Sequence, residues 1–285
     1  MTLVWRPGFS GLTQPEALAY VTAVEAADGQ ALETGVARAV DDFIIGCKAD
    51  GIWSAIKASC ILAGARTLNG ALVPLVGAAP TNFNFVSGDY DRKTGLVGDA
   101  AAKYLQTGWS PSAANQNNMH LAAYASTINA TGVNQHLIGA SSPSELWYAG
   151  TGGSTFFVYR ANDGTGQQNI GTNSAGLYGW SRSDSANKTI RYPSISVVQS
   201  QASTGVHTGP VTVYARPGAT SVGGHRLAFF TAGESLDLAA LDTRVTRLLN
   251  LITYALTPDL PELVTMDLDA AVYIGGVYRA GGTLA

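Results

Sequence analysis

The chain has 285 residues, enough for one large β domain with accessory elements or for two modest domains. Its formal net charge is −3 and its pI is about 5.8, so it lacks the basic surplus that neutralises nucleic-acid phosphates. Charged residues make up only 13% of the chain, whereas glycine, serine, threonine and asparagine are abundant. This composition argues against a nucleic-acid partner and favours turn-rich β structure with a neutral surface of hydroxyl and amide groups.

The sequence predicts neither export nor membrane insertion. Residues 1–10 contain no charged stretch followed by an apolar one, as a secretion signal would. No run approaches the roughly 18 apolar residues that cross a bilayer. We therefore expect a protein that is synthesised in the cytoplasm and has no membrane partner.

The N-terminal part has a helical pattern. Residues 14–61 show apolar positions spaced by three and four, which is typical of amphipathic helices. Breaks at residues 28–29 and 49–51 divide this stretch, so the sequence predicts three short helices, the last starting near Trp53. We expect a helical anchor or assembly module over residues 1–66.

The two cysteines, Cys47 and Cys60, both fall within this predicted helical module. Neither has a second Cys or a His at the spacing of a metal site. Small thiols in apolar helices usually serve packing, so we expect two buried free thiols, with a disulfide between them as the alternative.

In the middle of the chain the sequence pattern changes from one typical of helices to one typical of β strands. Glycine and proline over residues 67–85 predict an extended connector. From residue 86 to about 233, short alternating runs are separated by Gly, Asn and Ser turns, which predicts a mainly β jelly-roll sandwich. The clearest runs are 120–125, 155–159, 209–214 and 225–230.

A closing helix is predicted over residues 235–256, as the last element of a β domain that spans 86–257. Ser235 is the expected N-cap, and Asp237 suits the positive end of the helix dipole. Its apolar positions form a heptad seam: Leu238, Leu241, Val245, Leu248 and Ile252. The seam spans about two heptads, which favours docking against the β domain over a threefold bundle in an oligomer.

The C-terminal tail, residues 258–285, contains a stretch whose sequence is similar to one near the N-terminus. Residues 273–282 match residues 20–29 at Tyr, Val, Ala and Gly positions. A degenerate repeat and a chance match both explain this similarity.

Catalytic signatures are weak, and we expect no enzyme. The histidines are scattered: His120, His136, His207 and His225. No pair has the spacing of a metal site or a nucleophilic triad, so surface or partly buried strand positions are expected. Glu234 and Asp237 are the nearest approach to the carboxylate pair of a glycosidase, but the helix dipole explains Asp237 better.

Three acidic residues form a weak calcium candidate: Asp89, Asp91 and Asp99. Oxygen-rich loops can hold calcium, but the spacing lacks the other ligand positions of an EF-hand loop. The alternative is a solvated turn paired with Arg92 and Lys93. We therefore expect no cofactor, with calcium as the one open case.

Aromatic residues next to polar turns are the candidates for glycan binding: Trp109, Trp147, Tyr148, Tyr178 and Trp180. A flat ring offers an apolar face to sugar C–H groups, and the surrounding amides and hydroxyls can bind sugar hydroxyls. The competing explanation is the sandwich core, which also needs large aromatic side chains.

Residues 15–256 resemble a family of bacteriophage and phage-derived particle proteins. The resemblance is strongest over residues 43–105, where it rests on three motifs, GCKADGIW (46–53), LAGARTL (62–68) and GDYDRKTGLVGD (88–99). It also includes AADGQALE (26–33) before them and GESLDL (233–238) after the β domain. The chain departs from the family pattern at residues 99–102, where Gly and Ser are more usual than Asp-Ala-Ala-Ala. These motifs are packing and turn elements, so they identify the family without identifying a ligand.

The resemblance implies a virion structural protein of the tail-fibre, head-spike or minor type, with a concanavalin-A-like jelly roll. It also implies a homo-oligomer made in the bacterial cytoplasm and exposed on a particle. Residues 1–66, alone or with the tail, would attach to other virion proteins. Residues 86–233 would bind a host surface polysaccharide.

Two alternatives stay open at this stage. One is a purely architectural capsid or tail protein without glycan binding, in which the aromatic candidates are buried. The other is a polysaccharide depolymerase, which requires two convergent carboxylates in a cleft.

Overall fold

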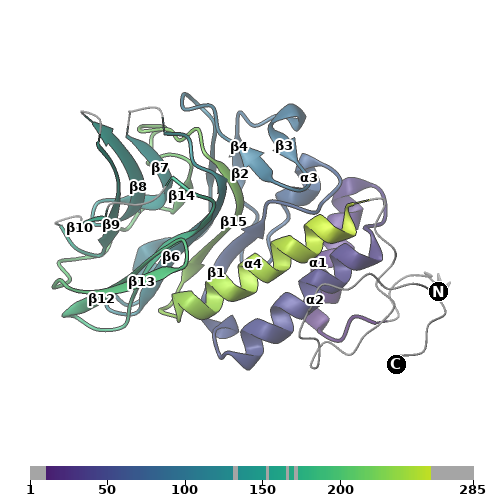
Figure 1. Ribbon diagram of the computed structural model, residues 1–285, viewed down its shortest axis with the longest axis horizontal. Coiled ribbons are helices and arrows are strands. Elements are labelled where there is room, and N and C mark those ends of the chain that lie inside the picture. Colours follow the sequence, from purple (N-terminus) through teal and green to yellow (C-terminus); the bar gives the residue numbers. More distant parts are fainter. Residues whose placement is uncertain (1–10, 131–133, 152–153, 165–166, 170–172, 258–285) are drawn as a thin grey trace, which may run out of the picture.

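A mainly β sandwich with a layer of helices forms the molecule (Figure 1). The two antiparallel sheets face each other, and the helices cover only one of them. This confirms the predicted jelly-roll sandwich with N-terminal helices and a C-terminal helix. The structure is a computed structural model that describes residues 11–130, 134–151, 154–164, 167–169 and 173–257.

We call the larger sheet the covered sheet, because helices pack on its outer face. Within the described residues it has eight strands, and β1 (Ile56–Ile61) pairs with β15 beside the main order. The main order is β13 (Ile195–Ser200), β12 (Asn187–Tyr192), β11 (Gly176–Arg182), β6 (Met119–Thr127), β15 (Arg226–Gly233), β4 (Gly95–Val97) and β3 (Tyr90–Asp91).

We call the second sheet the open sheet. It has seven strands in the described part of the chain, and Figure 1 shows it on the side away from the helices. Its order is β10 (Gln167–Asn169), β9 (Ser154–Ala161), β8 (Ser144–Thr151), β7 (Gln135–Ser141), β14 (Thr212–Val213), β5 (Tyr104–Gln106) and β2 (Thr81–Phe83). Strands β6, β9 and β15 confirm three of the four clearest predicted runs, whereas in the run 209–214 only Thr212–Val213 form a strand, β14.

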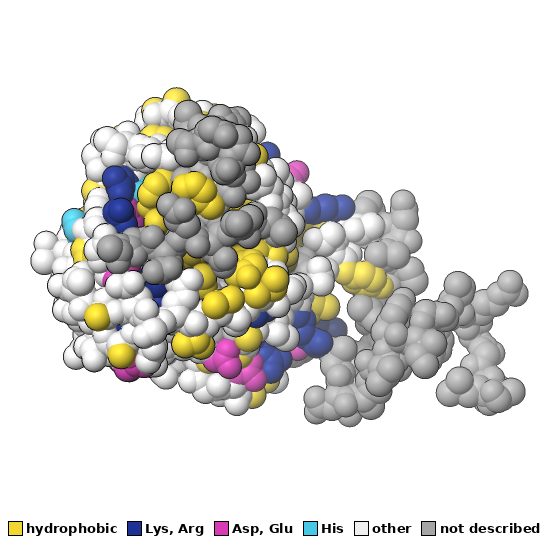
Figure 2. All heavy atoms as spheres, turned by 60° about the vertical axis from the view of Figure 1, so that its left-hand side comes forward, with side chains coloured by type: hydrophobic (Ala, Val, Ile, Leu, Met, Phe, Trp, Pro, Cys, Tyr) yellow, Lys and Arg dark blue, Asp and Glu magenta, His cyan; other side chains and the backbone are white. Residues whose placement is uncertain are grey.

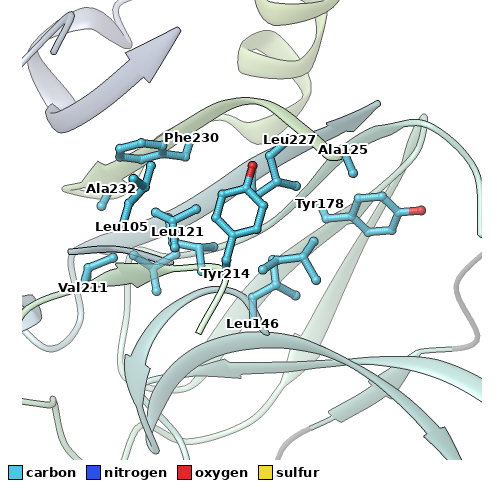
Figure 3. Close-up of a cluster of buried hydrophobic side chains, with 14 of the residues drawn as sticks. Leu105, Leu121, Ala125, Leu146, Tyr178, Val211, Tyr214, Leu227, Phe230 and Ala232 are labelled. Atoms are coloured by element: carbon cyan, nitrogen blue, oxygen red, sulfur yellow. The ribbon is translucent and has the colours of Figure 1, made fainter. Parts of the chain in front are cut away.

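Alternation along the strands builds the core between the sheets. On β11, Tyr178 points into the sandwich, whereas its neighbour Leu177 belongs to the cluster under the helices. Figure 3 shows the filled interior, to which both sheets and the segment around β14 contribute: Leu121, Tyr178 and Phe230 on one side, and Leu105, Leu146 and Val211 on the other.

The helical layer has its own core against the covered sheet. The main helices are α1 (Pro15–Asp28), α2 (Thr34–Ala49) and α4 (Leu238–Ala255). Phe43 of α2 meets Phe229 of β15 edge to face, with ring centroids 5.7 Å apart. The whole heptad seam of α4 is buried in this cluster, which confirms docking within the chain.

The N-cap of α4 is Asp237, two residues later than predicted. Its carboxylate accepts hydrogen bonds from the backbone N–H groups of Ala239 (2.7 Å) and Ala240 (3.2 Å). Ser235 does not cap the helix because its hydroxyl donates to Asn118 instead, at 2.6 Å.

The third predicted helix is wrong. Trp53–Ala55 forms one 3-10 turn, η1, and the following residues form strand β1. The strand is buried on both faces: Ala58 and Cys60 lie in the sandwich core, whereas Ile61 lies under the helices. Such two-sided burial removes the alternation that identifies a strand, so the pattern matches a helix equally well.

Both cysteines are buried free thiols, as predicted, although Cys60 lies on β1 and not on a helix. Burial raises the pKa of Cys47 to about 12, so this thiol stays protonated. The two thiols therefore serve as packing groups.

The predicted connector is only partly extended. Thr67 caps the single turn α3 (Leu68–Ala71), and β2 joins the open sheet. Two further 3-10 turns, η2 (Ser87–Asp89) and η3 (Pro111–Ala113), precede strands β3 and β6. The division of the chain at residue 66 stays a prediction, and β1 shows that the first part also contributes to the sheet.

The proposed tail repeat at residues 273–282 lies outside the described residues. Among the helices in the described ranges, none is both long and apolar enough to cross a bilayer.

Candidate functional site

Three of the five aromatic candidates are core residues. Tyr148, Tyr178 and Trp180 are fully buried between the sheets, where Tyr178 stacks on Phe157 with ring centroids 4.3 Å apart. They cannot contact a glycan at the surface, so the expectation for these three is wrong. Neighbouring polar turns misled the prediction, because turns flank inward-pointing and outward-pointing strand residues alike.

The other two candidates, Trp109 and Trp147, are half-buried. Trp109 lies in the loop after β5 and packs against the sandwich core. Its carbonyl accepts a hydrogen bond from the backbone of Val211 at 2.8 Å, which fixes the loop. Trp147 lies on β8 of the open sheet.

The calcium candidates each serve a turn. Asp89 pairs with Lys103 at 2.6 Å, and Asp91 and Asp99 accept backbone N–H groups two to four residues ahead. The expected partner Arg92 pairs with Glu33 instead, at 2.7 Å. In the part of the chain that the structure describes, no group of three His, Cys, Asp or Glu side chains could hold a metal ion.

Asp237 lies at the start of a helix as expected, whereas the histidines fall differently from expectation. Glu234 forms an ion pair with Lys57 at 3.1 Å, whereas Asp237 caps α4, so the two share no site. Three histidines are fully buried and only His207 is partly exposed: the buried ones are His120, His136 and His225. Burial lowers the pKa of His120 and His225 to about 4, so both are neutral at pH 7.

A charged cluster with an aromatic neighbour lies on the outer face of the open sheet. Leu146 and Tyr148 of β8 point into the core, so Glu145 and Trp147 point outward. The same alternation on β9 turns Arg160 outward, because Tyr159 and Ala161 are core residues. We call this set the open cluster: His136, Glu145, Trp147, Arg160 and Arg216.

Strand register brings these residues together. Glu145 lies opposite Arg160 across the β8–β9 pair, and Trp147 lies opposite His136 across the β7–β8 pair. Arg216 follows β14, which pairs with β7, and reaches the cluster from a segment 71 positions after Glu145. Four segments of the open sheet therefore converge on one carboxylate.

Glu145 is the centre of the open cluster. Its fully buried carboxylate accepts Nη1 of Arg160 at 2.6 Å, and Nε and Nη2 of Arg216 at 2.8 and 2.7 Å. The Nε2 atom of His136 lies 3.2 Å from the same carboxylate. Such a bidentate guanidinium pair is the strongest form of ion pair between side chains.

The electrostatics keep Glu145 ionised and His136 neutral. Burial alone would raise the pKa of Glu145, but hydrogen bonding to His136 and Arg216 outweighs it and lowers the pKa to about 2. Burial lowers the pKa of His136, and this outweighs the opposite effect of Glu145. At pH 7 the cluster therefore carries two guanidinium charges and one carboxylate charge.

Several polar atoms of the open cluster have no hydrogen-bond partner. They are buried nitrogen atoms: Nδ1 of His136, Nε1 of Trp147 and Nε of Arg160. Buried polar groups are normally satisfied by protein or ordered water, and atoms without a protein partner also occur elsewhere in the described residues, such as Nε1 of Trp180 and Oδ1 of Asp163. Both guanidinium groups remain partly accessible, with side chains 25% (Arg160) and 32% (Arg216) exposed.

Figure 2 brings this side of the molecule forward. It shows Lys and Arg side chains next to hydrophobic ones, on a face otherwise formed mainly by uncharged polar side chains and backbone. Of the open cluster, sequence analysis singled out Trp147 as a candidate. The available signal for the others was alternation around the buried residues 146, 148, 159 and 161, which places Glu145 and Arg160 on one face.

A second buried charge cluster joins the two sheets at one end of the sandwich. It also has one carboxylate and two cations, all fully buried, and we call it the closed cluster: Asp163, Arg182 and Lys188. Lys188 donates to Asp163 at 2.8 Å and to the carbonyl of Tyr159 at 2.7 Å. Arg182 donates to Asp163 and to four backbone carbonyls: those of Ala161, Asp184, Asn187 and Gln201.

An open depression of about 150 Å³ borders the closed cluster. Its charged groups already have partners: Lys188 bonds inward, and Asp184 accepts the backbone N–H groups of Ala186 and Asn187. The depression therefore offers less binding capacity than the open cluster.

No protein-family model matches the sequence, and no curated protein matches it. Among solved structures, the chain is similar to the botulinum neurotoxin serotype D binding domain, at a TM-score of 0.46 and 8% identity over 68% of this chain and 51% of that one. It is also similar to domain 4 of AbnA, a GH43 arabinanase from Geobacillus stearothermophilus (TM-score 0.37, 11% identity, 63% and 82% covered). A third similarity is to the enzymatically active domain of bacteriophage CBA120 tailspike protein 2 (TM-score 0.36, 15% identity, 61% and 30% covered). The chain spans about half the length of the neurotoxin binding domains that it matches.

Proposed function

We propose that the chain is a structural protein of a phage-like particle and that its β domain binds a host surface polysaccharide at the open cluster. The observation that carries the binding proposal is the half-exposed Trp147, which lies on the same face as the partly exposed guanidinium groups of Arg160 and Arg216. A ring face beside unused donors is what a sugar requires, because its C–H groups pack on the ring and its hydroxyls accept hydrogen bonds.

The two faces of the sandwich support this placement. Helices α2 and α4 occupy the outer face of the covered sheet, so that face cannot receive a polymer. The outer face of the open sheet carries no helix in the described residues, as Figure 1 shows. An extended polymer could therefore lie along strands β7, β8 and β9 without displacing any helix.

The particle role rests on the sequence resemblance, and the helical layer is compatible with it. Leu18 of α1 and Ile45 of α2 are exposed apolar side chains, at 48% and 42%. They offer contact points for another virion protein outside the glycan face. Many copies on one particle would let weak single sites act together.

In this proposal the site binds the polysaccharide without cleaving it. Both mechanisms of glycoside hydrolysis need two carboxyl groups, one of them able to hold a proton near neutral pH. The open cluster contains one carboxylate, and its pKa of about 2 prevents it from acting as a general acid. A purely architectural role is the remaining alternative, and it predicts no glycan binding at all.

The test is binding of the labelled full chain to host bacteria and to a mutant stripped of its surface polysaccharide. We expect binding that requires the polysaccharide and falls about tenfold or more with Trp147→Ala, since the lost ring contact is worth about 1.4 kcal/mol or more. Trp109→Ala is the matched control, because Trp109 is the other half-buried candidate. Circular dichroism confirms that each variant is folded.

Three results would overturn the proposal. Folded protein that binds neither strain would support the architectural role. Equal binding to both strains would exclude the polysaccharide as the receptor. Loss with Trp109→Ala but not with Trp147→Ala would move the glycan site to the β5 loop.

A further inference from the structure

The open cluster carries an excess positive charge on an acidic protein. Glu145 balances only one of the two guanidinium groups, and the buried His136 is neutral at pH 7. The whole chain has a formal net charge of −3, so the cationic character is local to this face. Local charge of this kind steers and holds ligands of the opposite sign.

The arginines also have unused hydrogen-bonding capacity. Arg160 donates only Nη1 to Glu145, so its Nη2 takes no part in that pair. Arg216 uses Nε and Nη2 on Glu145, and its Nη1 takes no part in that pair. Arginine presents five N–H donors, so each guanidinium keeps an edge for a second acceptor.

The position of Trp147 adds a constraint on the ligand. It lies on the same face of β8 as Glu145, two residues further along the strand, and therefore about 7 Å away. That separation is close to the length of one sugar ring with its substituent. A ring stacked on Trp147 can therefore extend an exocyclic group to the guanidinium groups around Glu145.

We propose that the ligand is an acidic polysaccharide, in which the carboxylate of a uronic or similar sugar acid binds the exposed guanidinium edges of Arg160 and Arg216 while the sugar ring packs on Trp147. Planar carboxylate and guanidinium groups match in geometry and form charge-assisted hydrogen bonds. A neutral glycan would leave the excess charge and the free donors unused. This inference rests on the proposed function and names the substrate class of the same site.

The first test modifies the ligand and leaves the protein unchanged. A panel of purified bacterial surface polysaccharides, some carboxylate-bearing and some neutral, is screened for binding to the full chain. We expect binding only to carboxylate-bearing polymers, and we expect reduction of their carboxyl groups to alcohols to weaken it at least tenfold. Added salt should weaken it further, because the sites are partly exposed to solvent.

The second test modifies the protein. Arg160→Gln and Arg216→Gln should each weaken binding to the acidic polymer about tenfold. Arg244→Gln is the matched control, because it removes the same charge from an arginine paired with Asp50 on the helical layer. Its binding should stay within about twofold of the unchanged protein, which separates the site from a general charge effect.

The outcomes distinguish the inference from the function on which it rests. Preferred binding to a neutral polymer, or binding that survives carboxyl reduction, would overturn the acidic ligand. If Trp147→Ala still abolished that binding, the glycan site would stand. Absence of binding to every polymer in the panel would count against both.

Discussion

The open and closed clusters contain the same number of positive and negative charges but differ in how these groups are buried and paired. Each has one carboxylate and two cations. In the closed cluster the cations are fully buried and every one has a carbonyl or carboxylate partner. In the open cluster the cations reach the surface and several nitrogen atoms lack partners.

This difference separates two uses of buried charge. The closed cluster links β9 of the open sheet to β11 and β12 of the covered sheet, so it fixes the sandwich. Unpaired charges are too costly to bury, so both of its cations are paired, although Oδ1 of Asp163 has no hydrogen-bond partner. The cations of the open cluster reach the surface, where a ligand can bind their remaining N–H donors. What distinguishes a structural cluster from a binding site is whether the N–H donors of its cations are buried and paired, more than how many charges it has.

The largest expected effect is on the closed cluster. Asp163→Ala leaves two buried cations without a counter-charge, so we expect the free energy of unfolding to fall by about 3–5 kcal/mol. Urea unfolding followed by circular dichroism measures it. Asp50→Ala is the control, because it breaks a partly exposed pair with Arg244 and should cost at most about 1 kcal/mol. Equal losses in the two variants would contradict the comparison.

A smaller effect is expected when one cation of the closed cluster is removed. Lys188→Met keeps the side-chain volume and leaves Arg182 to balance Asp163. The remaining cost is the loss of two hydrogen bonds, one to the carbonyl of Tyr159 and one to Oδ2 of Asp163, about 2–3 kcal/mol by the same urea measurement. A loss as large as that of Asp163→Ala would show that charge balance does not govern the closed cluster.

The smallest expected effect is the pH dependence of stability. It concerns the open cluster, which contains a histidine, whereas the closed cluster contains none. Burial lowers the pKa of His136 in the folded state, so the unfolded chain binds this proton more readily. The contribution of neutral His136 is complete above the unfolded pKa of about 6.5 and is lost as the pH falls, at up to about 1.4 kcal/mol per pH unit. Glu145, Arg160 and Arg216, which face it, keep their charges in this window, since the pKa of Glu145 is about 2.

His136→Gln isolates this contribution from those of the other buried histidines. The stability of the unchanged protein relative to this variant should decrease between pH 7 and pH 5.5, as followed by urea unfolding. His225 also lies near His136 and has a pKa lowered to about 4, so it stays neutral in the folded state throughout this range. A constant difference between the two proteins would show that His136 is not held neutral by burial.

Local pattern predicted most of the fold. Alternating runs identified β6, β9 and β15, and the heptad seam identified α4 together with its docking face. The pattern failed at β1, because burial on both faces erases alternation. It also placed the N-cap of α4 two residues early, because Ser235 has a tertiary partner, Asn118, that no local pattern reveals.

The site was predicted less completely than the fold. Trp147 was among the aromatic candidates, but so were Tyr148, Tyr178 and Trp180, which are core residues. Glu145 and Arg216 are 71 positions apart, and no spacing rule connects them. Their meeting depends on the pairing of β14 with β7 and of β7 with β8.

The sequence by itself determined the fold class, the presence of α1, α2 and α4 on either side of the sandwich strands, and the neutral character of the surface. These properties follow from composition and from periods of two and 3.6 residues, which act over short stretches. Only the tertiary structure decided which aromatic rings are exposed, which sheet the helices cover and which charges meet. Those properties depend on strand register and on contacts between distant segments, where a shift of one residue would turn Glu145 and Trp147 into the core.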